Sequence, residues 1–168
     1  YYAGLLGGAA SDYNSWSLTE NGQTQNYSGY ITTKITDLAI DWIGNQTKPW
    51  FCWLAYTAPH TPFHLPPTEM HSQGNLPTDQ ASIDANPMPY FMAMTESIDY
   101  EVTRLLATLS ESELDNTVII FIGDNGSHSQ VIQSPYQNDQ AKGSLYQGGI
   151  HVPMIISGAW VSRKNTNE

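Results

Sequence analysis

The sequence contains a single cysteine, Cys52. A chain with one cysteine has no internal disulfide framework, and it cannot form a zinc site built from several cysteines. Cysteine usage therefore gives little information about the compartment. Cys52 lies within an apolar run and is followed by Trp-Leu-Ala, so we expect it to be a small hydrophobic residue of a buried strand.

Positively charged residues are also scarce. Six Lys plus Arg stand against sixteen Asp plus Glu, which gives a formal net charge of -10. Such a chain repels polyanions, so we expect neither nucleic acid nor an anionic membrane as a partner. The longest apolar runs are only as long as a strand, and no basic segment followed by an apolar one opens the sequence. The sequence therefore predicts neither a transmembrane helix nor a signal peptide.

What is present fits a folded domain with a real core. The chain has 168 residues, of which 40% are hydrophobic. It opens at Tyr1 rather than at Met, and it ends in a polar tail at residues 162–168. We therefore expect residues 1–168 to be a fragment of a larger domain.

The most informative stretch is T-V-I-I-F-I-G-D-N-G at residues 117–126. Its apolar run is β-branched or aromatic throughout, which predicts a strand buried on both faces. Asp124 and Asn125 follow at once, and open α/β sheets hold their ligands at the carboxyl ends of the strands. These two side chains are therefore candidate ligands of a hard cation. Taken alone, however, Asn-Gly is a strong turn signal, and a plain turn is the simpler interpretation.

Helical and extended patterns alternate along the chain. Residues 1–17 lack a clear period and are expected to be irregular, apart from a short strand that begins at Trp16 and enters a hairpin around Asn21-Gly22. An amphipathic helix follows, with Ser28 as its N-cap, and it ends at Gly44-Asn45. The later elements are a strand at 50–56, a polar surface segment at 63–89, a helix at 90–109, a polar loop at 127–141 and a strand at 154–157. This order predicts an α/β fold with a central, mostly parallel sheet flanked by helices.

Three short motifs carry the candidate chemistry. They are A-P-H-T-P at residues 58–62, G-D-N-G at 123–126, and K-G-x-x-x-Q-G-G-x-x-V-P at 142–153. Each is weak alone. Together and in this order they resemble the sulfatase family of the alkaline-phosphatase superfamily, and the resemblance runs along essentially the whole chain.

The resemblance implies a role for four residues. Asp124 and Asn125 would be two ligands of a calcium ion, and their hard oxygen atoms also allow magnesium as the nearest competitor. Lys142 would hold negative charge at the sulfate end of the ester, although most lysines are simply solvated. His60 would contact the sulfate and protonate the leaving alcohol, although a lone histidine is more often a packed or surface residue. The prolines on either side of His60 favour the catalytic interpretation.

The departures from the family are informative. The family nucleophile is a formylglycine made from Cys or Ser in a C/S-x-P-x-R motif, and this sequence contains no such motif. The chain therefore resembles the second half of a catalytic domain, with the nucleophile expected upstream. Gln147 and His151 stand where the family usually shows Glu and Arg, and we hypothesise that they form a neutral hydrogen-bonded pair. Phe63 and Tyr136 are candidate stacking surfaces for a sugar or aryl ring, and His64, His71 and His128 are expected in loops.

The expected function is sulfuric ester hydrolysis, the cleavage of an organic sulfate monoester to alcohol and sulfate, by the complete protein. Two alternatives remain, a phosphoesterase of the same superfamily and a non-catalytic module that binds sulfated glycans. The family resemblance alone implies a periplasmic or secreted location.

We expect the isolated chain to show no turnover of a chromogenic aryl sulfate, because it has no nucleophile to attack sulfur. The measurement is a release assay on the purified 168-residue chain. Hydrolysis that persists after purification to homogeneity would contradict this prediction.

Overall fold

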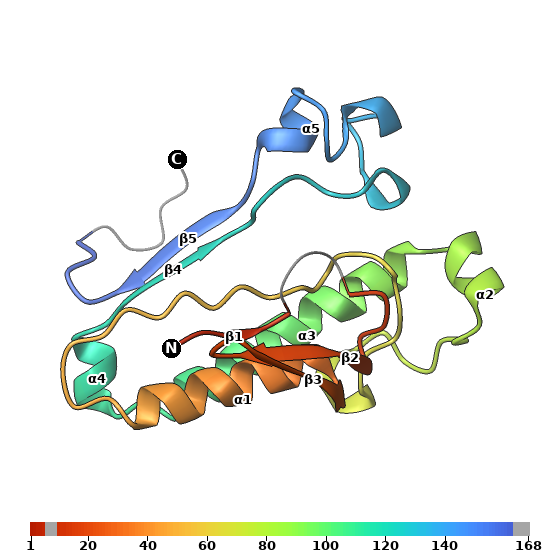
Figure 1. The fold of residues 1–168 in the computed structure, drawn as a ribbon. Helices are drawn as coiled ribbons and strands as arrows, with labels where there is room; N and C mark the ends of the chain where they lie inside the picture. The colour runs from red at the N-terminus through yellow and green to blue at the C-terminus, as the bar shows by residue number, and fades with distance from the viewer. Residues whose placement is uncertain (6–9, 163–168) are drawn as a thin grey trace. The chain divides into compact units, whose positions relative to one another are not determined.

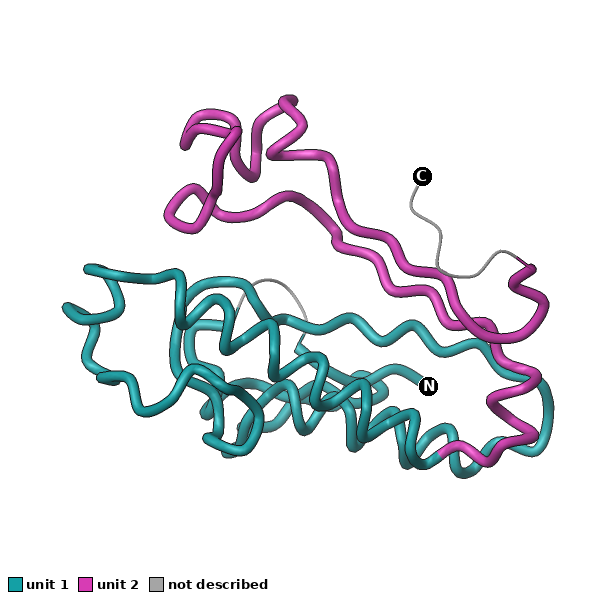
Figure 2. The backbone as a smooth tube through the Cα atoms, turned by 180° about the vertical axis from the view of Figure 1, so that it is seen from behind, with its two compact units in different colours: residues 1–108 teal, residues 109–168 magenta. Residues whose placement is uncertain are grey.

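The computed structural model describes residues 1–5 and 10–162 (Figure 1). The chain forms two compact units, Tyr1–Thr108 and Leu109–Glu168 (Figure 2). Residues 6–9, within the stretch predicted to be irregular, and most of the polar tail lie outside the described residues.

A small antiparallel sheet opens the first unit. It consists of β1 (Ala3–Gly4), β2 (Ser15–Glu20) and β3 (Gln23–Ser28), in the order β1-β2-β3. Asn21 and Gly22 connect β2 to β3 with φ values of 47° and 85°. Two consecutive positive φ values suit the tight turn of a hairpin, and Asn-Gly tolerates them best. The predicted hairpin is confirmed, while β1 adds a strand where irregular structure was expected.

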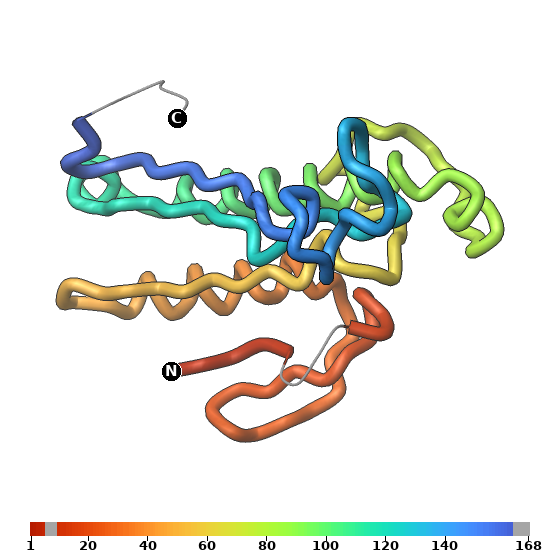
Figure 3. The backbone as a smooth tube through the Cα atoms, turned by 90° about the horizontal axis from the view of Figure 1, so that it is seen from above, coloured from red at the N-terminus to blue at the C-terminus, as the bar shows by residue number. Residues whose placement is uncertain are grey.

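Two long helices form the core of the first unit. Helices α1 (Ile31–Gly44) and α3 (Met88–Leu106) pack against each other and run side by side in Figure 3. The prediction for the end of α1 is confirmed, but its N-cap is Tyr30 rather than Ser28. Helix α3 begins two residues before the predicted start, because Pro89 in its first turn has the fixed φ that a helix start accepts.

A charged cluster links the two helices. The Glu101 side chain is fully buried, and its Oε2 accepts a hydrogen bond of 2.7 Å from Nε of Arg104. The Arg104 guanidinium also contacts Asp37 Oδ1 at 2.8 Å, so it joins α3 to α1. Glu101 Oε1 has no hydrogen-bond partner within the described part of the chain. The buried carboxylate therefore depends on Arg104 for compensation of its charge.

The predicted strand at residues 50–56 is not formed. The segment is extended but pairs with no strand among the described residues, and Phe51 and Trp53 are each 83% exposed. Alternate side chains of the segment point towards the rest of the first unit, and Cys52 is half-buried as a result. This burial raises the pKa of the Cys52 thiol. The apolar run was correctly recognised as extended, but a strand also needs a neighbouring backbone to pair with.

The polar segment at 63–89 contains two short helices, η1 (Thr68–Met70) and α2 (Gln80–Ala85). Asp79 caps α2, because its side chain accepts a hydrogen bond from the backbone N–H of Ser82. Among the described residues, no helix is long and apolar enough to cross a membrane.

The second unit is built on a two-stranded antiparallel ladder. Helix α4 (Glu111–Asp115) leads into β4 (Val118–Ile122), which pairs with β5 (Met154–Gly158). The remaining short helices are η2 (Ser129–Val131), η3 (Asn138–Gln140) and α5 (Gln147–Ile150).

Two predictions about β4 are wrong. The expected central parallel sheet is absent from the described residues, whose sheets are both small and antiparallel. Strand β4 was expected to be buried on both faces, yet Phe121 is 41% exposed and its neighbour Ile122 is 58% exposed. Parallel neighbours arrive through crossover connections, whereas the chain returns from β4 to β5 in the opposite direction. The mixed α/β composition itself is confirmed.

We expect Arg104→Met to lower the free energy of unfolding by about 2 kcal/mol, because it leaves the Glu101 carboxylate buried without a partner. The cost should be below that of a fully buried pair, since the Arg104 side chain is 35% exposed. Urea denaturation of the chain measures it. The double variant Arg104→Met/Glu101→Met should recover part of the loss, and a single variant as stable as the wild type would contradict the prediction.

Candidate functional site

The ladder of the second unit brings two of the three motifs together. Beyond its last pair, the Gly123 N–H donates to Pro153 O at 3.0 Å and the Gly126 N–H donates to Gly149 O at 2.9 Å. The Lys142 N–H donates to Ser127 O at 2.9 Å. The G-D-N-G turn and the residue that follows it are therefore bonded to the start, middle and end of the K-G-x-x-x-Q-G-G-x-x-V-P segment.

This contact requires glycine. A Cβ atom added to Gly126 would lie 1.9 Å from Gly148 O, and one added to Gly149 would lie 2.4 Å from Ser144 O. The obstacles are backbone atoms, which cannot rotate away as a side chain can. The glycines of both motifs therefore serve close backbone approach.

Asp124 and Asn125 lie in the turn that this contact holds. Asp124 is exposed and Asn125 is half-buried. The Asn125 Nδ2 group donates to Gly126 O at 3.2 Å, which uses the amide nitrogen internally and leaves Oδ1 for another partner. A carboxylate and an amide oxygen are hard ligands, so the two residues fit as part of a calcium site. No group of three or more His, Cys, Asp or Glu that could hold a metal ion occurs within residues 1–5 and 10–162.

Lys142 is exposed beside the same turn. Its backbone is fixed by the bond to Ser127, while its ammonium forms no ion pair among the described residues. A fixed backbone with an uncommitted cation is suited to an anionic ligand.

His60 lies in the first unit, in the loop between α1 and α3. Its Nδ1 lies 2.8 Å from Thr61 O, and a carbonyl can only accept, so Nδ1 carries the proton in the neutral ring. Nε2 is then the unprotonated nitrogen of the neutral ring. The structure thus brings Asp124, Asn125 and Lys142 together in one unit, and it places His60 in the other.

Two expectations about neighbouring residues are wrong. Phe63 is only 5% exposed and packs edge-on against Phe91, with ring centroids 6.0 Å apart, so it has no open face for stacking. Tyr136 is half-buried, and its hydroxyl donates to Gln147 Oε1 at 3.2 Å, so stacking by its ring stays a prediction. The predicted side-chain pair of Gln147 and His151 is absent from the described contacts, because the two residues meet through their backbones at 2.8 Å.

His64 is the residue whose importance sequence reasoning missed. It was expected only to be a loop residue, but its ring contacts Tyr13 and Tyr30 and both of its nitrogens have polar partners. The sequence carries a faint signal for it, a second histidine four residues after His60 in the same proline-rich segment.

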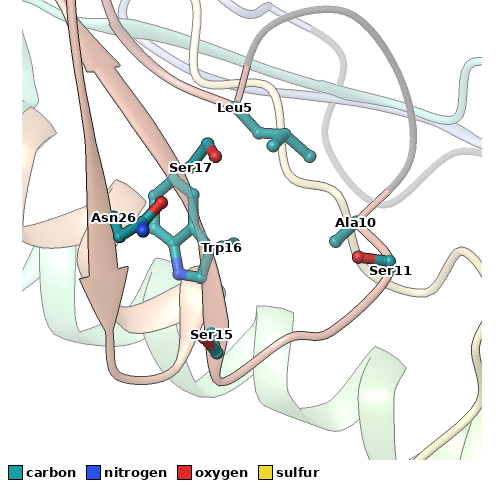
Figure 4. Close-up of a pocket in the computed structure, with 7 residues that line it drawn as sticks. All are labelled: Leu5, Ala10, Ser11, Ser15, Trp16, Ser17 and Asn26. Atoms are coloured by element: carbon teal, nitrogen blue, oxygen red, sulfur yellow. The ribbon is translucent and has the colours of Figure 1, made fainter.

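A surface pocket of about 370 Å³ lies beside the hairpin of the first unit (Figure 4). It contains none of the predicted site residues and no titratable side chain, so its lining does not provide acid, base or cation chemistry. The lining residues are Leu5, Ala10, Ser11, Ser15, Trp16, Ser17 and Asn26.

The arrangement of the motifs agrees with comparison to known proteins. The family model described as Sulfatase matches residues 2–168. The chain belongs to the sulfatase family. The resemblance recognised in the three motifs is thereby confirmed.

The relatives of this sulfatase-family chain are much longer than the chain itself. It is 33% identical to the uncharacterized sulfatase YdeN of Escherichia coli (strain K12), over 93% of this chain and 28% of that protein. It is 26% identical to the N-acetylglucosamine-6-sulfatase of Homo sapiens, over 94% of this chain and 34% of that protein. The chain therefore spans about a third or less of the length of these relatives.

A solved structure shares the fold. The structure of Ps i-CgsB in complex with k-i-k-neocarrahexaose is similar with a TM-score of 0.67 at 29% identity, covering 83% of this chain and 30% of that one. The sulfatase-family chain is thus a partial sulfatase-like α/β fold.

We expect Gly126→Ala to disrupt the contact between the two motifs, because the added Cβ would collide with Gly148 O. The cost should be about 1–3 kcal/mol, as for other overpacking substitutions. Hydrogen exchange at the Gly126 amide and thermal unfolding measure it. Gly44→Ala is the matched control, since nothing lies within 4 Å of its Cβ position. Equal exchange rates in wild type and Gly126→Ala would contradict the prediction.

Proposed function

We propose that this chain supplies part of the calcium site and the leaving-group residues of a sulfuric ester hydrolase, which cleaves an organic sulfate monoester to alcohol and sulfate. One observation carries the proposal. Support comes from the backbone bonds of Gly126 and Lys142, which join the turn with two hard oxygen ligands to the segment that carries an uncommitted ammonium. The Asp124 carboxylate suits a metal cation, and the Lys142 ammonium suits the sulfate anion that would bind next to that cation.

Lys142 acts on the sulfate end of the ester. Negative charge moves from the sulfate oxygens towards the bridging oxygen as the sulfur–oxygen bond breaks, and a cation aimed at that region stabilises the transition state more than the ground state. The backbone bond to Ser127 fixes the base of this flexible side chain.

His60 acts on the leaving alcohol. Its Nδ1–H is held by Thr61 O, so Nε2 is the nitrogen that delivers a proton when the ring is protonated. A proton delivered to the departing oxygen avoids the release of a strongly basic alkoxide.

Two groups complete the chemistry. Asp124 Oδ and Asn125 Oδ1 would hold part of a calcium shell whose charge would neutralise sulfate oxygens, and the remaining ligands would come from outside this chain. A formylglycine nucleophile, expected outside this chain, would supply the attack on sulfur.

We propose a carbohydrate sulfate ester as the substrate class. Support comes from the N-acetylglucosamine-6-sulfatase relative and from the neocarrahexaose bound in the similar solved structure.

The full-length protein tests the function. Turnover of sugar sulfates and aryl sulfates, faster than that of the matching phosphate esters, would support it. Faster turnover of phosphate esters would identify a phosphoesterase, and binding of sulfated glycans without turnover would identify a binding module.

We expect Lys142→Ala in the full-length protein to reduce kcat by about 100-fold or more, because it removes an electrostatic stabiliser of the transition state. Thermal stability should change little, since Lys142 is exposed. Lys48→Ala is the control for loss of an exposed lysine elsewhere. Activity near the wild-type value would show that Lys142 is only a solvated residue.

We expect the isolated chain to bind calcium weakly, with a Kd of roughly 0.1–1 mM or above, because two residues supply few of the six to eight oxygens that calcium takes. In the full-length protein binding should be tighter, and Asp124→Ala should abolish it by removing a charged ligand. Calorimetric titration measures both, with Asp139→Ala as an exposed acidic control from the same unit. Calcium binding by Asp124→Ala at wild-type affinity would reduce Asp124 to the first residue of a turn.

A further inference from the structure

We propose that Tyr13, Tyr30 and His64 form a positioning cluster that fixes the loop carrying His60, and so sets where its imidazole delivers a proton. The proposal rests on the proposed role of His60 as the acid for the leaving alcohol. The three residues come from separate parts of the first unit, and they meet at this loop.

Tyr13 holds the loop through its backbone. Its side chain is 2% exposed, and its hydroxyl lies 2.7 Å from His60 O and 3.1 Å from Thr57 O. Both oxygens are carbonyls, so the single hydroxyl proton is shared between them, with the shorter contact to His60 O. Burial raises the pKa of Tyr13, which keeps that proton in place. The His60 N–H also donates to Thr57 O at 3.1 Å, which closes a turn from Thr57 to His60. The Tyr13 hydroxyl therefore contacts the first and the last residue of this turn.

His64 forms the second layer of the cluster. Its ring centroid lies 4.2 Å from that of Tyr13. Its Nδ1 lies 3.1 Å from Pro62 O, so this nitrogen donates, and its Nε2 lies 3.1 Å from the Tyr30 hydroxyl. Burial lowers the pKa of His64, which favours the neutral ring, and the Tyr30 hydroxyl then donates to Nε2. A neutral, doubly bonded imidazole is a structural element rather than a second acid.

Tyr30 anchors the cluster to the helical core. It is the N-cap residue of α1 and is 7% exposed, and its hydroxyl lies 3.3 Å from Ser97 Oγ on α3. The N–H of Ile31, the first residue of α1, donates to Tyr13 O at 2.9 Å. Each member of the cluster is therefore attached to the packed helix pair, directly or through one neighbour.

The cluster controls His60 because the polar contacts of the imidazole lie within the loop. His60 Nδ1 bonds Thr61 O at 2.8 Å and lies 3.4 Å from Thr61 Oγ1. The ring therefore follows the backbone of residues 57–62, and that backbone is held by Tyr13 and His64. A catalytic group that is slightly misplaced loses rate without loss of the fold.

Leaving-group dependence separates this role from a structural one. An alkyl or sugar sulfate needs a proton on its leaving oxygen, whereas 4-nitrophenyl sulfate releases a stable phenolate and needs none. In the full-length enzyme, Tyr13→Phe removes the hydroxyl but keeps the ring against His64. We expect it to lower kcat/KM for an alkyl sulfate by about 3- to 10-fold, the equivalent of one neutral hydrogen bond, and to leave 4-nitrophenyl sulfate within about 2-fold.

Matched variants complete the test. Tyr30→Phe should give the same selective loss, since it removes the hydroxyl bonded to His64 Nε2. Tyr90→Phe is the control, because it removes another buried tyrosine hydroxyl that bonds a loop carbonyl, Pro77 O at 2.6 Å. It should affect both esters alike or neither, and thermal unfolding of each variant reports on folding.

The outcomes distinguish this proposal from the proposed function. His60→Ala should be the most selective variant, with a larger loss on the alkyl ester than Tyr13→Phe. If His60→Ala is selective and Tyr13→Phe and Tyr30→Phe match Tyr90→Phe, the positioning cluster is wrong and the role of His60 stands. If His60→Ala lowers both esters equally, or the wild-type enzyme cleaves no sulfate ester, both proposals are overturned.

Discussion

The second unit depends on the close approach of two backbones, at Gly126 and at Gly149. The Gly126 N–H donates to Gly149 O at 2.9 Å, and this hydrogen bond joins positions more than twenty residues apart in the chain. It depends on the absence of a Cβ at Gly126, since Gly148 O occupies the space that a side chain there would need. The β4–β5 ladder brings the two segments into register, and the turn with Asp124 and Asn125 follows directly from it.

The two units hold their candidate residues by different physical means. In the second unit, main-chain hydrogen bonds define the turn, so the candidate side chains project from a bonded backbone and keep few contacts of their own. In the first unit, buried aromatic side chains hold the loop of His60, with Tyr13 and His64 between that loop and the helices. Main-chain support resists substitution of side chains, whereas support by side chains is sensitive to the loss of one hydroxyl.

Local patterns predicted local structure well. The periodic stripes of α1 and α3 and the Asn21-Gly22 turn depend on residues a few positions apart, and these elements formed with small shifts at their ends. The pairing of β4 was mispredicted because a strand partner is chosen by distant residues that no periodicity reveals. Asp124, Asn125 and Lys142 were found through motifs, and their catalytic roles stay predictions. The contacts of Tyr13 with His60 and His64 had no sequence signal, since each crosses more than forty positions.

The hydrogen bond from Lys142 N–H to Ser127 O closes a loop at its base. The excursion between these two residues contains η2, η3 and Tyr136, and its two ends are joined by this hydrogen bond. Such an excursion can lengthen, shorten or change its side chains at small entropic cost, because the closure does not depend on what lies inside it. Asp124 and Lys142 would keep their places throughout. The sequence of this excursion can therefore vary without moving the two candidate residues at its base.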